Sequence, residues 1–99
     1  MSDPELEDFL ILRNLDEPLP EETFRAVAEG AGEVLQDLND EGVGIRWAKS
    51  YIRTKPDGTV VGTFCHYQAE NEEALREHAD RAGLPVTQID LHGKTLEAE

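Results

Sequence analysis

The dipeptide Asp57-Gly58 constrains the fold of this chain more than any other local feature. It lies between two segments rich in β-branched and aromatic residues, 45–54 and 59–68. Asp-Gly favours a two-residue turn because that turn needs positive φ angles, which glycine adopts without a steric cost. The sequence therefore predicts a β-hairpin in the middle of the chain, with these two segments as its strands.

An amphipathic helix is predicted before the hairpin. Pro20 suits a first helical turn, two glutamates follow it, and the segment 39–44 ends the helix. Gly30 and Gly32 each weaken the helix by about 1 kcal/mol relative to alanine, a cost that a close approach to the sheet could offset. The apolar stripe comprises Phe24, Val27, Ala28, Ala31, Leu35 and Leu38.

A second amphipathic helix is predicted after the hairpin. Asn71 can cap its first turn, Gly83 supplies a stop, and Pro85 prevents continuation. The inner stripe comprises Leu75, His78, Ala79 and Ala82.

Two further strands, 8–15 and 86–91, complete the order βαββαβ. This order predicts an α+β, ferredoxin-like sandwich in which two helices cover one face of a four-stranded antiparallel sheet. The open face is expected to meet a second copy, giving a homodimer with an α/β-barrel interior. We expect one domain at 8–92, a disordered N-terminal segment at 1–7 and an acidic C-terminal tail at 93–99.

The charge of the chain limits its partners. Asp and Glu number 22 against 9 Lys and Arg, a formal net charge of -13. Such a field repels nucleic acid and anionic membrane surfaces, so neither is an expected partner. It suits a high-salt habitat, although an ordinary acidic protein could share it. The single cysteine permits no internal disulfide, and the first residues carry no secretory leader, so we expect a cytoplasmic protein.

The hairpin register assigns side chains to the two faces of the sheet. If Asp57 and Gly58 form the turn, Ser50 lies opposite Cys65. Cys65 then faces the helices, whereas Trp47, Lys49, Tyr51, Phe64 and His66 face the open side. A β-bulge would exchange the faces of one strand relative to the other.

Two separate metal sites are therefore conceivable. Cys65 could approach His78 on the second helix, forming a thiolate-imidazole pair that binds nickel, zinc or copper or activates a nucleophile. Alternatively, His66, Asp90 and His92 could gather on the open face, where copies from a dimer would complete a nickel or zinc site. The competing interpretation of Cys65 and His78 is that they pack in the core. The competing interpretation of His66, Asp90 and His92 is that they are ordinary polar residues of a surface or interface.

A ligand pocket is a third hypothesis. Arg13, Trp47, Tyr51 and Tyr67 could line a pocket for a flat organic ligand, although aromatic side chains also serve simple packing. The chain contains no phosphate-binding glycine loop, nucleophile elbow, H-E-x-x-H or C-x-x-C motif, which excludes enzyme classes built on those motifs in their usual form.

Three short motifs resemble the small domain-of-unknown-function family numbered 4242. They are W-x-x-S-Y at 47–51, C-x-Y-x-A at 65–69 and H-A-x-x-x-G-x-P at 78–85, within a match that runs from about Phe9 to Leu91. The resemblance implies a dimeric ferredoxin-like fold, and the family includes a nickel-binding protein. His66 stands where an apolar residue is more typical of the family.

The resemblance leads us to expect a binding protein for a divalent transition metal, nickel preferred, that senses, buffers or sequesters it and is not an enzyme. One alternative is a cofactor-free or haem-type enzyme, or a small-ligand binder, that uses a dimer-interior pocket lined by Arg13, Trp47, Tyr51 and His66. Another alternative is an interaction domain without a ligand.

Overall fold

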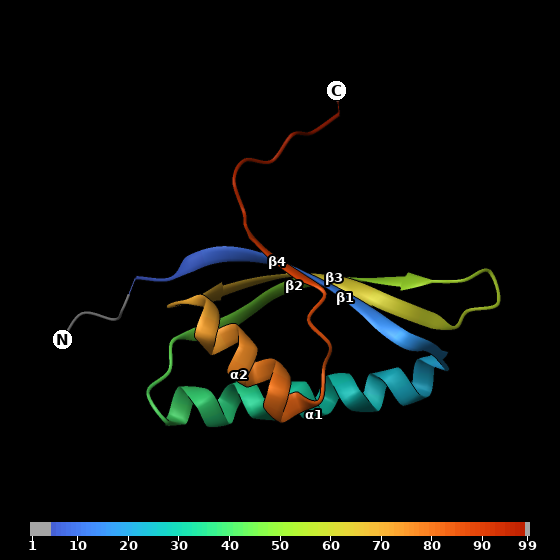
Figure 1. Ribbon diagram of the computed structural model, residues 1–99, viewed down its shortest axis with the longest axis horizontal. Coiled ribbons are helices and arrows are strands. Elements are labelled where there is room, and N and C mark those ends of the chain that lie inside the picture. Colours follow the sequence, from blue (N-terminus) through green and yellow to red (C-terminus); the bar gives the residue numbers. More distant parts are fainter. Residues whose placement is uncertain (1–4, 99) are drawn as a thin grey trace.

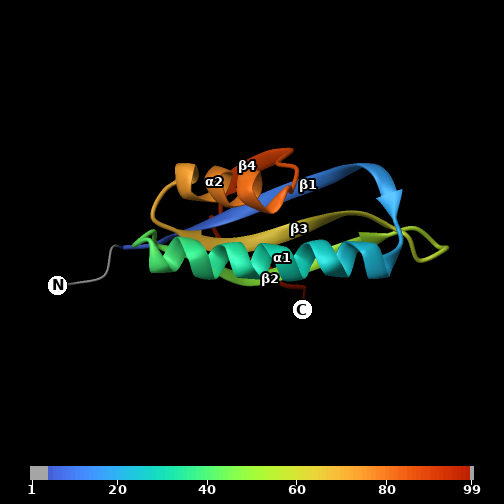
Figure 2. The same ribbon diagram turned by 90° about the horizontal axis from the view of Figure 1, so that it is seen from below.

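The elements follow one another in the order βαββαβ in the computed structural model, which describes residues 5–98. They are β1 (Glu7–Leu19), α1 (Glu21–Asp40), β2 (Ile45–Thr54), β3 (Val60–Ala69), α2 (Glu72–Ala82) and β4 (Gln88–Leu91). The four strands form one antiparallel sheet in the order β2-β3-β1-β4. Both helices lie on one face of this sheet (Figures 1 and 2). The expected ferredoxin-like sandwich is confirmed.

The core lies between the helices and the two central strands. Phe9, Ile11 and Arg13 alternate along β1 and are all buried, so this side of the strand faces the helices. Leu38 of α1 and Leu75 of α2 are fully buried against it. Neither helix within residues 5–98 is long and apolar enough to span a membrane.

The two helices begin and end for different local reasons. The side chain of Asn71 accepts a hydrogen bond from the backbone N–H of Ala74 at 2.9 Å, as expected for the cap of α2. Gly83 follows α2 with φ of 70°, the left-handed conformation that ends many helices. At α1, Pro20 provides no side-chain hydrogen bond, and acidic residues in the first turn interact favourably with the helix dipole instead.

The two glycines of α1 do not mark a close approach to the sheet. A Cβ built at Gly30 or Gly32 would meet no neighbouring atom within 4 Å. The expectation that tight packing offsets their low helix propensity is wrong. The space beside Gly32 belongs to a cavity, described below.

The hairpin turn is longer than the sequence predicted. Lys55 N–H donates to the Thr59 carbonyl at 2.9 Å, so Thr59 does not pair with Pro56. Gly58 has φ of 89°, and the Asp57 carboxylate accepts from the N–H of Thr59 at 2.9 Å. The turn therefore needs one residue more than Asp57-Gly58.

Two β-bulges lie between β2 and β3. The first, between Arg53 and Thr54, compensates for the longer turn, so Ser50 still pairs with Cys65 as expected. The second lies between Trp47 and Lys49, where Trp47 pairs with Tyr67 instead of an open-face residue. Trp47 therefore turns to the helix-facing side, and its expected place on the open face is wrong.

Strand lengths also differ from the sequence-based expectation. β1 continues to Leu19, well beyond the expected end at residue 15, with a register shift after Asn14. β4 is short and pairs with β1 alone, from Phe9–Leu91 to Leu12–Gln88. After β4, the chain leaves the sheet on the side away from the helices (Figure 1).

Candidate functional site

A histidine pair lies on the open face of the sheet. The rings of His66 and His92 stack with their centroids 5.1 Å apart. His66 projects from β3, and His92 directly follows β4, where its backbone N–H donates to the Asp8 carbonyl at 2.9 Å. The hydrogen-bonded pairing of β4 with β1 thus brings together two histidines that are far apart in the sequence.

Asp8 completes this group. Its Oδ1 lies 2.8 Å from His66 Nε2 and accepts a second hydrogen bond from Gln68 Nε2 at 3.2 Å. A carboxylate can only accept, so Nε2 of His66 donates and Nδ1 is left with the lone pair in the neutral ring. The hydrogen bond from His66 lowers the pKa of Asp8 below its usual value, and the charge of a protonated His92 acts in the same direction.

The sequence anticipated the two histidines of this group but not Asp8. Asp8 pairs with Gln68 across β1 and β3, a long-range register that no local pattern reveals. Asp90 also lies on the open face, opposite Leu10, but its carboxylate accepts a hydrogen bond from Gln88. Among residues 5–98, no group of three or more His, Cys, Asp or Glu side chains is arranged to hold a metal ion.

Cys65 lies on the helix-facing side, as expected, within a short chain of hydrogen bonds. Trp47 Nε1 donates to Ser50 Oγ at 2.8 Å, and Ser50 Oγ donates to Cys65 Sγ at 2.9 Å. The thiol in turn donates to Thr63 Oγ1 at 3.3 Å. The Cys65 sulfur thus lies between the hydroxyl groups of Ser50 and Thr63.

His78 is buried in α2 and has different partners from Cys65. Its Nε2 donates to the Ala31 carbonyl at 2.9 Å, and its ring lies 5.6 Å from that of Tyr67. Burial lowers the pKa of His78, which favours the neutral imidazole. Within the described part of the chain, His78 Nδ1 has no hydrogen-bond partner. The imidazole thus joins α2 to α1, as a core histidine does.

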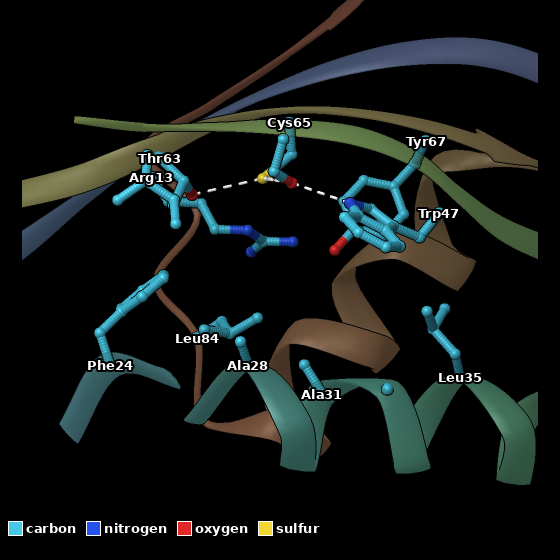
Figure 3. Close-up of a pocket in the computed structure, with 13 residues that line it drawn as sticks. Arg13, Phe24, Ala28, Ala31, Leu35, Trp47, Thr63, Cys65, Tyr67 and Leu84 are labelled. Atoms are coloured by element: carbon cyan, nitrogen blue, oxygen red, sulfur yellow. Dashed lines mark hydrogen bonds between the residues drawn. The ribbon is translucent and has the colours of Figure 1, made fainter. Parts of the chain in front are cut away.

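A cavity of about 420 Å³ lies between the sheet and α1 (Figure 3). Three of the four residues expected in a ligand pocket line it, namely Arg13, Trp47 and Tyr67. The fourth, Tyr51, pairs with Phe64 on the opposite face, where the Lys49 ammonium lies 5.0 Å from its ring centroid. The α1 side of the cavity consists of Phe24, Ala28, Ala31, Gly32 and Leu35.

Arg13 is the charged group of this cavity. Its side chain is buried, with Nη1 donating to the Pro85 carbonyl at 2.9 Å and the guanidinium 5.7 Å from the centre of the Tyr67 ring. Burial raises the pKa of Tyr67, so its hydroxyl stays neutral. The sequence singled out Arg13 but could not show that it lies beneath the helices.

A family model described as "Nickel responsive protein SCO4226-like" matches residues 9–91. The chain belongs to this family. The SCO4226-like match covers the same span as the resemblance noted from the sequence motifs, and it confirms the connection with nickel at the level of the family.

Among solved structures, the crystal structure of SCO4226 from Streptomyces coelicolor A3(2) is similar to this chain, with a TM-score of 0.61. The similarity covers 92% of this chain and 99% of that chain at 17% sequence identity, and it supports the fold of the SCO4226-like domain. No curated protein sequence matches the chain significantly.

Proposed function

We propose that this protein binds a divalent transition metal, nickel in preference to zinc or copper, and that it senses, buffers or sequesters the ion. The observation that carries the proposal is the stacked pair His66 and His92 beside Asp8 on the open face. Imidazole and carboxylate groups are ligands that nickel and zinc accept. The nickel-responsive description of the family supports the same choice.

The hydrogen bond between Asp8 and His66 fits a metal-binding role. Metal-ligating histidines usually donate their second ring N–H to a carboxylate or carbonyl, which orients the ring and raises its basicity. Asp8 occupies that position at 2.8 Å from Nε2 and leaves Nδ1 of His66 for a ligand. Asp8 would therefore orient His66, while His66 and His92 would hold the ion.

One chain supplies too few ligands for a closed site, because residues 5–98 contain no cluster of three or more metal-ligating side chains. We propose that a second copy completes the site across the open face, forming a homodimer. Tyr51 and Phe64 on this face are 58% and 38% exposed, which is apolar surface that a second copy would cover. Asp90 lies on the same face and could contribute a further carboxylate.

Calorimetric titration of untagged protein with nickel and then zinc tests this proposal. We expect binding by the native protein and a loss of at least tenfold in affinity in His66→Ala and in His92→Ala. Cys65→Ala is the matched control, because it removes a potential ligand from the opposite face and should leave the affinity unchanged. Absence of nickel binding by the native protein, or loss only in Cys65→Ala, would overturn the proposal.

A further inference from the structure

The cavity between the sheet and α1 contains a buried cation, Arg13, for which residues 5–98 supply no counter-ion. Arg13 is 2% exposed, and none of the ion pairs formed by the described residues includes it. Its Nη1 is bonded to the Pro85 carbonyl, but Nε and Nη2 have no partner within residues 5–98. A buried guanidinium is costly unless it is paired, because arginine keeps its charge.

The absence of an acidic partner for Arg13 among residues 5–98 is informative in a chain with 22 acidic residues. Three arginines of the surface, Arg25, Arg76 and Arg81, each contact at least one glutamate. Arg13 instead extends into the space between Cys65 on the sheet and Ala31 on α1 (Figure 3). The N–H groups of Nε and Nη2 therefore lie buried at the wall of the cavity, without a hydrogen-bond partner among residues 5–98.

The walls of the cavity indicate the chemistry of a ligand that would bind beside Arg13. They are mostly apolar, with Phe24 and Leu35 on α1 and Trp47 and Tyr67 on the sheet. The volume of about 420 Å³ lies within the range of small-molecule sites. Small residues on α1 create this space, since a Cβ at Gly32 would meet no atom within 4 Å. Trp47 lines the cavity and is 56% exposed, so this part of the lining reaches the protein surface.

We propose that this cavity binds a small organic carboxylate with an apolar body, whose carboxylate pairs with Nε and Nη2 of Arg13. The planar guanidinium matches a carboxylate in a two-point hydrogen-bonded pair. A single cation among apolar walls suits a monoanion and not inorganic phosphate, which carries more charge and needs more donors. The site lies on the opposite side of the sheet from the histidine pair, so the proposal is independent of metal binding.

Trp47 is the only tryptophan of the chain and lines the cavity, so its fluorescence reports occupancy. The probes are octanoate and 4-phenylbutyrate, each compared with the alcohol of the same carbon skeleton, and inorganic phosphate. We expect saturable binding of at least one acid, at least tenfold tighter than its alcohol, and none of phosphate. In Arg13→Met the preference for the acid should disappear.

Because Arg13→Met could fold poorly, a second pair of variants tests the cavity without altering the arginine. Gly32→Leu fills the cavity and should weaken binding of the acid at least tenfold. Gly30→Leu places the same side chain on the same helix outside the lining residues and should bind as the native protein does. The proposal would be overturned by equal affinities for acids and alcohols or by binding of phosphate alone. It would also be overturned if neither acid binds at millimolar concentration, or if Gly32→Leu binds the acid as tightly as the native protein does.

Discussion

Gly62 lies in β3 between two neighbouring strands, and the side chain of Arg53 crosses over it. Arg53 Nη2 donates to the Arg13 carbonyl at 2.9 Å. A Cβ at residue 62 would collide with both that carbonyl and the guanidinium of Arg53. We expect Gly62→Ala to lower the free energy of unfolding by about 2 to 3 kcal/mol, measured by urea denaturation.

The control for this prediction is Gly32→Ala, where the added methyl group meets no atom within 4 Å. Alanine is the better helix former by about 1 kcal/mol, so this variant should be more stable than the native protein. A Gly62→Ala protein as stable as the native one would show that the strands separate more easily than the structure indicates.

His78 gives the stability of the protein a pH dependence. Burial holds its pKa below the usual 6.5, so the unfolded chain binds this proton more readily than the folded one. The contribution of the neutral ring is thus complete above about pH 6.5 and is lost as the pH falls toward the lower folded-state pKa, with a slope of at most about 1.4 kcal/mol per pH unit.

The measurement compares the free energy of unfolding of the native protein with that of His78→Gln between about pH 7.5 and about pH 5. We expect the native protein to lose more stability than the variant over this interval. Parallel curves for the two proteins would mean that His78 titrates in the folded state as it does in the unfolded one.

At the scale of the elements, local chemistry predicted the helices well and the strand faces only in part. Asn71 and Gly83 act within one helical turn, so their capping roles could be read from the sequence. The bulge beside Lys49 could not be read from the sequence, because it depends on pairing with β3. This bulge places Trp47 beside the cavity and not on the open face.

The same distinction applies to the candidate site. Alternation along β3 correctly separated Cys65 from His66, which point to opposite faces. The approach of Asp8 to His66 depends on the β1 to β3 register and was missed. Sequence patterns thus identify side chains that share a strand face, whereas contacts between strands require the assembled sheet.

The cap of α2 offers a prediction at this scale. Asn71→Ala removes the acceptor for the Ala74 N–H and should lower the free energy of unfolding by about 1 kcal/mol, measured by urea denaturation. Asn71→Asp keeps an acceptor at the same place and should retain most of the stability. Equal losses in the two variants would contradict the capping role.

At the scale of the whole molecule, the net charge of -13 should make stability depend on salt. Repulsion between surface carboxylates is screened as ionic strength rises, and the Debye length is only about 3 Å at 1 M salt. We therefore expect the melting temperature to rise between low salt and molar potassium chloride. A melting temperature that does not change over this range would contradict both this prediction and the proposed high-salt habitat.

The proposed metal site also depends on the whole assembly, because the described residues of one chain do not close it. Native mass spectrometry of untagged protein during a nickel titration counts copies and metal ions in the same particle. We predict that nickel appears on dimers of the native protein, and that this species is lost in His66→Ala and kept in Cys65→Ala. Nickel bound to monomers, and retained in His66→Ala, would contradict the account.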